Sequence, residues 1–187
     1  MNPPITNTQF PIILGITGLK QSGKDTSAQL LIKHLYPYRS IRLAFADSLK
    51  NEVASLFGIS AEELEARKSL SGMRKFLQWW GTELSRRDND NHWIELLHEK
   101  VSKVPEDTAF VIITDCRFLN EAKYIRDNKG MIFRVQRGYT DNKDLHSSET
   151  EQSKIIVDHT IDNSFKLERL DFECKNMAAI IKDRFKL

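Results

Sequence analysis

The chain has 187 residues, of which 40% are hydrophobic and 29% are charged, and its formal net charge is +2. This length and composition exclude a disordered chain and a mini-scaffold, and they predict one globular domain over residues 1–187 with a substantial core. The near-neutral charge argues against a nucleic-acid or anionic-membrane binder, although a local cluster of arginines could still bind phosphate.

The two cysteines, Cys116 and Cys174, lie far apart without a CxxC or Cys/His spacing. A disulfide framework or a zinc cluster is therefore not expected, and a reducing, cytoplasmic setting fits. No apolar run approaches the ~18 residues of a membrane span, and residues 1–10 lack the pattern of a signal peptide. We expect a cytoplasmic protein that binds neither membranes nor nucleic acid.

The first 58 residues alternate between strand and helix patterns. Residues 11–17 form a short apolar run, which predicts a strand buried on both faces of a parallel sheet. A glycine-containing break follows, and apolar residues then recur at helical spacing from Asp25 until Pro37. A second strand is predicted over 41–46, followed by a helix over 47–57 that Gly58 would terminate.

Residues 59–105 carry only helical patterns. Ser60 and Glu63 form a capping-box pattern, and helices are predicted over 61–68, 71–87 and 91–104. We interpret this segment as a helical insert that acts as a lid or binding lobe, because long inserts in α/β enzymes usually cover a site.

Strand and helix patterns alternate again after the insert. The predicted elements are a strand over 110–114, a helix over 119–128 with Gly130 as its stop, a strand over 131–135, an irregular stretch over 137–149, a weaker strand over 156–161 and a helix over 167–185. Such alternation predicts an α/β fold of three layers, with a mostly parallel five-stranded sheet between helices. Ligands of such sheets bind beyond the carboxyl ends of the strands.

A glycine-rich motif, Gly18-Leu-Lys-Gln-Ser-Gly23-Lys24, lies between the first predicted strand and helix. It fits G-x-x-x-x-G-K, in which glycines let backbone N–H groups converge on phosphate oxygens and the lysine reaches the β and γ phosphates. The pattern favours binding of a nucleoside triphosphate, and the alternative is a structural glycine-rich turn.

The motif normally continues with a Ser or Thr whose hydroxyl ligates magnesium, but here Asp25 precedes Thr26. Asp25 could accept hydrogen bonds from metal-bound water, or it could cap the following helix. The sequence leaves both interpretations open.

Asp115 directly follows the predicted strand 110–114. This position resembles that of a strand-end carboxylate that faces the phosphates and the metal ion in phosphoryl-transfer enzymes. The alternative is an N-cap of the next helix. Arg117 and Glu121 are four residues apart and could share a helix face, where an arginine suits phosphate and acids suit sugar or base donors.

Basic and aromatic residues alternate in the insert. They are either a solvated basic face over an aromatic core or lid arginines that balance charge during phosphoryl transfer, with a tryptophan stacked on a base. These residues are Arg74, Lys75, Arg86, Arg87, Trp79, Trp80 and Trp93.

Several segments together resemble the phage-type deoxynucleoside monophosphate kinase family, a branch of the P-loop kinases, from Ile12 to about Leu170. The resemblance rests on the segments 18–26, 45–50 (Phe-Ala-Asp-Ser-Leu-Lys), 77–83 (Leu-Gln-Trp-Trp-Gly-Thr-Glu), Trp93, 114–121 (Thr-Asp-Cys-Arg-Phe-Leu-Asn-Glu) and 146–149 (His-Ser-Ser-Glu). The family's glycine-lysine-aspartate-threonine signature accounts for Asp25.

The resemblance implies ATP as phosphoryl donor, Mg²⁺ as cofactor and a role for each matching residue. Lys24, Arg117 and Arg74 would be catalytic, and Asp25 and Thr26 would hold the metal. The ATP-binding residues would be Lys20, Gln21, Ser22, Gly23, Lys24, Asp25 and Thr26. The monophosphate site would be formed by Leu49, Lys50, Arg74, Gly81, Thr82, Trp93, Asp115, Arg117, Glu121 and Ser148.

The predicted activity is ATP-dependent phosphorylation of a deoxynucleoside 5′-monophosphate to the diphosphate. Two alternatives remain: a P-loop kinase for another small acceptor, such as a coenzyme precursor, and a nucleic-acid-stimulated ATPase or nucleotide-sensing protein. Kinases of this family often form homodimers, although no segment identifies an interface, and a phage-encoded member would work in the host cytoplasm.

Overall fold

The computed structural model describes residues 10–67, 72–138 and 147–187, which form two compact units. The sheet unit comprises the chain up to Leu43 and from Val104 onward, and the helical unit comprises Ala44–Lys103. The helical unit therefore starts before the predicted insert at residue 59. No helix in the described ranges is long and apolar enough to cross a membrane.

The sheet unit is built on five parallel strands in the order β2-β3-β1-β4-β5. Their bounds are β1 Ile12–Thr17, β2 Arg39–Leu43, β3 Thr108–Ile113, β4 Met131–Gln136 and β5 His159–Asp162. Strand β1 is central, with Gly15 aligned with Ile113 of β3 and with Ile132 of β4. This arrangement confirms the predicted parallel α/β sheet.

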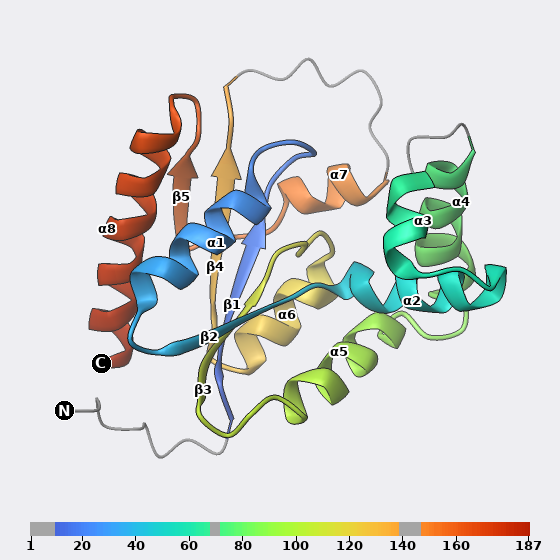
Figure 1. Ribbon diagram of the computed structural model, residues 1–187, viewed down its shortest axis with the longest axis horizontal. Coiled ribbons are helices and arrows are strands. Elements are labelled where there is room, and N and C mark those ends of the chain that lie inside the picture. The colour runs from blue at the N-terminus through green and yellow to red at the C-terminus, as the bar shows by residue number, and fades with distance from the viewer. Residues whose placement is uncertain (1–9, 68–71, 139–146) are drawn as a thin grey trace. The chain divides into compact units, whose positions relative to one another are not determined.

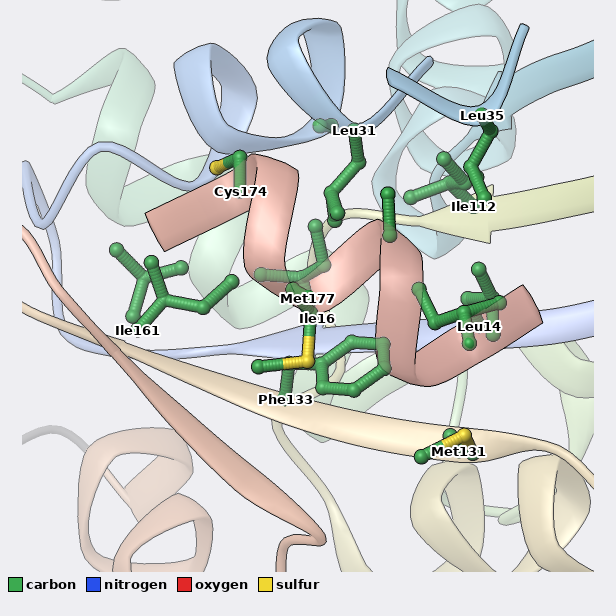
Figure 2. Packing of buried hydrophobic residues seen from close by; sticks show 14 of the residues in the cluster. Leu14, Ile16, Leu31, Leu35, Ile112, Met131, Phe133, Ile161, Cys174 and Met177 are labelled. Carbon is green, nitrogen blue, oxygen red and sulfur yellow. The ribbon is translucent and has the colours of Figure 1, made fainter. Parts of the chain in front are cut away.

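Helices cover both faces of this sheet (Figure 1). They are α1 Lys24–Leu35, α6 Leu119–Asp127, α7 Ser147–Ser153 and α8 Leu167–Phe185. Figure 2 shows α1 and α8 contributing Leu31 and Met177 to a cluster with Leu14 and Ile16 of β1. Each such side chain stabilises the fold by about 1.5–3 kcal/mol when it is fully buried.

The opposite face of β1 packs on α6. A Cβ at Gly15 would collide with the Ile125 side chain of α6, so the glycine lets this helix approach the sheet closely. Because β1 is apolar on both faces, its sequence reads as a continuous apolar run rather than an alternating one.

The helical unit consists of α2 Phe45–Phe57, α3 Ala61–Arg67, α4 Met73–Trp79, a π-helical turn η1 Trp80–Leu84, and α5 His92–Ser102. Gly58 ends α2 with φ 64°, as predicted. Ser60 Oγ accepts the Glu63 N–H at 3.1 Å, as the capping pattern predicts. The core of the unit includes Val53 and Leu64.

Some predicted boundaries are wrong. The second strand was expected over 41–46, but it ends at Leu43 and α2 begins at Phe45, because the apolar residues that follow are buried in a helix instead. The predicted helix over 71–87 is interrupted by η1. Residues 147–149, expected to be irregular, begin α7.

The predicted role of Gly130 is also corrected. Helix α6 ends at Asp127, and the left-handed residue that follows is Lys129, with φ 58°. Gly130 instead provides a close approach, because a Cβ there would collide with the carbonyl oxygen of Ile13. The weak strand predicted over 156–161 starts later, at His159, and Ile156 is 85% exposed.

Candidate functional site

The glycine-rich loop connects β1 to α1 at the carboxyl end of the central strand. Helix α1, which follows β1, lies on one face of the sheet, and α6, which follows the neighbouring strand β3, lies on the other. Connections therefore leave β1 and β3 toward opposite faces. In open α/β sheets, ligands bind beyond the strand ends at such a position.

The conformation of the loop requires its two glycines. Gly18 has φ 145° and Gly23 has φ 97°, values that side-chain-bearing residues rarely adopt. A Cβ at Gly18 would also collide with the Val135 carbonyl oxygen of β4 and lie 2.9 Å from Ser22 Oγ. The loop thus lies close against the neighbouring strand.

Several backbone donors of the loop have no acceptor among the residues that the structure describes. Ser22 N–H donates to the Leu19 carbonyl at 3.2 Å, but the amides of Lys20, Gln21 and Gly23 donate to no backbone oxygen of the described residues. Gly23 is the N-cap of α1, and no side chain caps this end. These amides and the positive end of the helix dipole suit a phosphate group.

The Lys24 ammonium lies over the same loop. Its Nζ donates to the carbonyl oxygens of Gly18 and Leu19, both at 2.7 Å. Three hydroxyl groups around the loop, on Thr17, Ser22 and Ser27, are buried with no hydrogen-bond partner among the described residues. The loop therefore combines a cation with polar atoms that no described residue satisfies.

Asp25 and Thr26 both lie in the exposed first turn of α1. The Asp25 carboxylate makes no capping hydrogen bond, and it lies 3.5 Å from the Arg42 guanidinium of β2. Gly23 is the N-cap, so Asp25 does not cap the helix through a hydrogen bond, but its carboxylate in the first turn is favourable to the helix dipole. Carboxylate and hydroxyl oxygens are suitable ligands for Mg²⁺, so the donor set fits this ion.

Asp115 belongs to a segment that lies against the end of β1, the strand that precedes the glycine-rich loop. It follows β3, and the next residue, Cys116, donates its N–H to the Ile16 carbonyl of β1 at 3.1 Å. This bond holds the segment after β3 against the end of β1. The N-cap of α6 is Phe118, so the alternative interpretation of Asp115 as that cap is wrong.

Glu121 is almost entirely buried, with 2% of its surface exposed. Its Oε2 accepts the N–H groups of Arg117 at 2.7 Å and Phe118 at 3.1 Å. Arg117 precedes α6, so the predicted shared helix face does not exist. Glu121 instead fixes the backbone of Arg117, whose side chain is exposed.

Burial raises the pKa of the Cys116 thiol well above its usual value, and the charges of Glu121 and Asp115 raise it further. A thiol with such a pKa stays protonated at neutral pH and is a poor nucleophile. Cys116 therefore contributes packing rather than chemistry to this part of the site.

In the helical unit, three of the predicted residues contact one another. The indole N–H of Trp93 in α5 donates to the Gly81 carbonyl at 2.8 Å. A Cβ at Gly81 would lie 2.8 Å from the Leu49 side chain of α2. Trp93 is 3% exposed, so its ring is enclosed, and Thr82, the residue after Gly81, is half-buried.

Two basic residues predicted for the monophosphate site also belong to this unit. Lys50 in α2 forms an ion pair with Glu65 of α3, with Nζ and Oε2 2.9 Å apart. Arg74 is half-buried in the first turn of α4, and Lys75 beside it is exposed.

The other basic and aromatic residues of the insert have mixed surroundings. Arg86 is 8% exposed and donates to the Asp90 carbonyl at 3.1 Å, so it stabilises the interior of the unit, whereas Arg87 is exposed. Trp80 packs on Phe76 with ring centroids 5.6 Å apart, and Trp79 is 43% exposed.

The last predicted site residue, Ser148, belongs to α7, but its side chain lies outside the described part of the structure, as does His146. One residue that the sequence analysis missed contacts the glycine-rich loop: the Asn163 side chain donates to the Ser22 carbonyl at 2.8 Å. No local pattern marks it, because the two residues are 141 positions apart.

Comparison with known proteins identifies relatives of the chain. Residues 58–173 match the family model of deoxynucleotide monophosphate kinase. A protein of Acanthamoeba polyphaga mimivirus named "Putative deoxynucleotide monophosphate kinase" is 31% identical, and the match covers 77% of this chain and 83% of that protein.

Solved structures of two small-molecule kinases share the fold. A gluconokinase from Sinorhizobium meliloti 1021 superposes with a TM-score of 0.51 at 14% identity, covering 96% of this chain and 98% of that one. Shikimate kinase from Aquifex aeolicus gives a TM-score of 0.51 at 15% identity, covering 92% and 98% respectively. At these identities the similarity supports the P-loop kinase fold alone.

Proposed function

This chain belongs to the deoxynucleotide monophosphate kinase family, and from that membership we propose that it transfers the γ-phosphoryl group of ATP to a deoxynucleoside 5′-monophosphate. The products would be ADP and a deoxynucleoside diphosphate. The observation that carries this proposal is the loop between β1 and α1, with its two left-handed glycines and the Lys24 ammonium over it.

We assign the loop residues 20–26 to the triphosphate of ATP. The Gly23 amide and the uncapped start of α1 would bind phosphate oxygens, and Lys24 would exchange its carbonyl partners for the β and γ phosphates. Asp25 and Thr26 would hold a magnesium ion, and Asp115, which follows β3, would lie near it. The ion would neutralise charge that develops on the transferred phosphoryl group.

We assign the acceptor to Arg117 and to the other residues that the family resemblance names. Arg117 would bind the monophosphate, because a guanidinium offers two parallel N–H donors to phosphate oxygens. Lys50, Arg74, Leu49 and Thr82 would complete the site, together with Ser148. Trp93 would act through Gly81, whose carbonyl it binds, rather than by stacking its enclosed ring on a base.

The proposed chemistry needs no covalent intermediate, since the acceptor is already an anionic phosphate oxygen. The protein would align that oxygen with the γ-phosphorus, balance the charge with Lys24, Arg74 and Arg117, and exclude water. Alignment and charge balance are what P-loop kinases supply to phosphoryl transfer.

The proposal is tested by ADP release with ATP, magnesium and each ribo- and deoxyribonucleoside monophosphate in turn, beside a reaction without acceptor. We expect turnover with at least one deoxynucleoside monophosphate. Lys24→Ala should lower kcat by about 10²–10³-fold, because it removes a cation that stabilises the transition state. Lys123→Ala, which removes an exposed ammonium paired with Asp127, is the matched control and should keep wild-type activity.

Two outcomes would contradict the proposal. Turnover with a different small acceptor and none with deoxynucleotides would make the protein a kinase of another substrate class. Wild-type turnover by Lys24→Ala would remove the loop from the reaction.

A further inference from the structure

Asn163 is the first residue after β5, and its place in the fold is firmly set. Its backbone N–H donates to the carbonyl of Gln136, at the end of β4, at 2.7 Å, and only 9% of its surface is exposed. The side chain thus projects from a fixed backbone position at the carboxyl edge of the sheet.

The side chain contacts two consecutive residues of the glycine-rich loop. Its Nδ2 donates to the Ser22 carbonyl at 2.8 Å in a buried environment. The same amide nitrogen occupies the space that a Cβ on Gly23 would need. The absence of a side chain at Gly23 therefore serves two purposes: it permits φ 97°, and it admits Asn163.

We infer that Asn163 is a positioning residue that fixes the direction of the Gly23 amide for phosphate binding. The peptide unit is planar and trans, so the Ser22 carbonyl and the Gly23 N–H point in opposite directions. The hydrogen bond from Asn163 fixes the direction of the Ser22 carbonyl, and it therefore also fixes the Gly23 N–H in the opposite direction. The Gly23 N–H donates to no backbone oxygen of the described residues, which leaves it for a ligand.

An asparagine is the appropriate residue for this task. The Ser22 carbonyl can only accept, so the partner must donate, and the neutral amide does so without introducing charge. An aspartate of the same shape would place a carboxylate oxygen against the carbonyl oxygen. An alanine would leave a buried carbonyl without its donor and would free the peptide to rotate.

This inference rests on the proposed function, because the ligand of the loop is the triphosphate of ATP. A donor that is already oriented costs no reorganisation when the ligand binds. Loss of Asn163 should therefore weaken binding of ATP, while the monophosphate should bind as before.

The test compares Asn163→Ala with Asn128→Ala. Asn128 Nδ2 also donates to a backbone carbonyl at 2.8 Å, that of Tyr124 at the end of α6, and it is remote from the loop in sequence. ATP affinity is measured by calorimetry and KM for each substrate by ADP release. We expect the Kd and KM for ATP to rise about tenfold in Asn163→Ala, as for one lost hydrogen bond, and to stay unchanged in Asn128→Ala.

A second measurement uses no nucleotide. Hydrogen exchange of the peptide that covers residues 18–27 should be faster in Asn163→Ala and in the near-isosteric Asn163→Asp than in the wild type or Asn128→Ala. The aspartate variant serves if the alanine variant fails to fold.

The outcomes separate the two proposals. Wild-type ATP affinity in both Asn163 variants, or an equal loss in Asn128→Ala, would overturn the role of Asn163 alone. Loop exchange that the Asn163 variants leave unchanged would overturn it as well. A wild-type chain that binds no ATP would overturn the proposed function, and the role of Asn163 with it.

Discussion

The Glu121 carboxylate shows how one side chain can support a site from the interior. It accepts the N–H groups of Arg117 and Phe118 and is almost fully buried. Hydrogen bonds from backbone amides to a carboxylate are among the stronger ones, and removal of a helix-capping acceptor typically costs ~1 kcal/mol. A substitution of Glu121 that changes binding of the acceptor would therefore act in part by moving Arg117.

We predict that Glu121→Gln lowers the free energy of unfolding by about 1–2 kcal/mol, because a neutral amide oxygen is a weaker acceptor for the two N–H groups than the carboxylate oxygen that they share. It should also lower kcat/KM for the monophosphate while KM for ATP stays unchanged. Urea denaturation and initial-rate kinetics measure the two effects.

The matched control is Glu151→Gln. Glu151 accepts the Leu119 N–H at the same end of α6, at 2.9 Å, but the bond is exposed to solvent. Glu151→Gln should therefore change the free energy of unfolding and kcat/KM for the monophosphate less than Glu121→Gln does. A Glu121→Gln variant with wild-type stability would contradict the capping role.

The sequence pointed to those residues of the candidate site whose signal is local. Gly18, Gly23 and Lys24 have a fixed spacing in the sequence, because they belong to a single short loop between a strand and a helix. Asn163 could not be found in this way, since its partner is reached only after the sheet has formed. Glu121 was singled out, but its backbone partners became visible only in the structure.

At the scale of an element, the π-helical turn Trp80–Leu84 was the feature hardest to predict. The sequence favours one continuous helix over 71–87, and a π-turn departs from the regular i to i−4 hydrogen bonds. The Gly81 carbonyl accepts a hydrogen bond from outside the helix, from Trp93. A tertiary partner thus compensates a local irregularity, and such turns often mark functional sites.

We predict that Trp93→Phe destabilises the protein by about 2–3 kcal/mol, because the smaller phenyl ring leaves a cavity at this buried position and the Gly81 carbonyl loses its donor. If Gly81 and Thr82 belong to the acceptor site, KM for the monophosphate should rise several-fold, and the Kd for ATP should not change. Thermal denaturation and kinetics with the monophosphate varied measure these effects.

Trp79→Phe is the control for this substitution. Trp79 is 43% exposed, so the same change of ring should have a small effect on both stability and KM. If Trp93→Phe raised KM for ATP instead, η1 would not serve the acceptor.

Across the whole chain, the order of strands and helices was predictable because each buried strand reads as an apolar run between turn signals. Boundaries were predicted less well where apolar residues continue past the end of a strand. Ala44 and Phe45 are both buried, but they belong to α2 and its N-cap rather than to β2. Burial alone does not distinguish the end of a strand from the start of a buried helix.

The two cysteines allow the opening of the sheet unit to be measured. Both are buried in it, Cys116 after β3 and Cys174 in α8. Burial raises the pKa of the Cys174 thiol to about 12 and that of Cys116 well above its usual value. At pH 8 both thiols are therefore protonated and shielded, so a thiol reagent should modify them only after the unit opens.

We predict that DTNB modifies both thiols of the native protein only slowly at pH 8. The control is the protein in 6 M guanidinium, in which both thiols should react immediately. With ATP at about 100 times its Kd, the slow native reaction should become ~100-fold slower, because a ligand of the folded state adds about 2.7 kcal/mol. In Lys24→Ala the same ATP concentration should protect much less. Rapid modification of either thiol in the native wild type would show that the sheet unit opens locally around it.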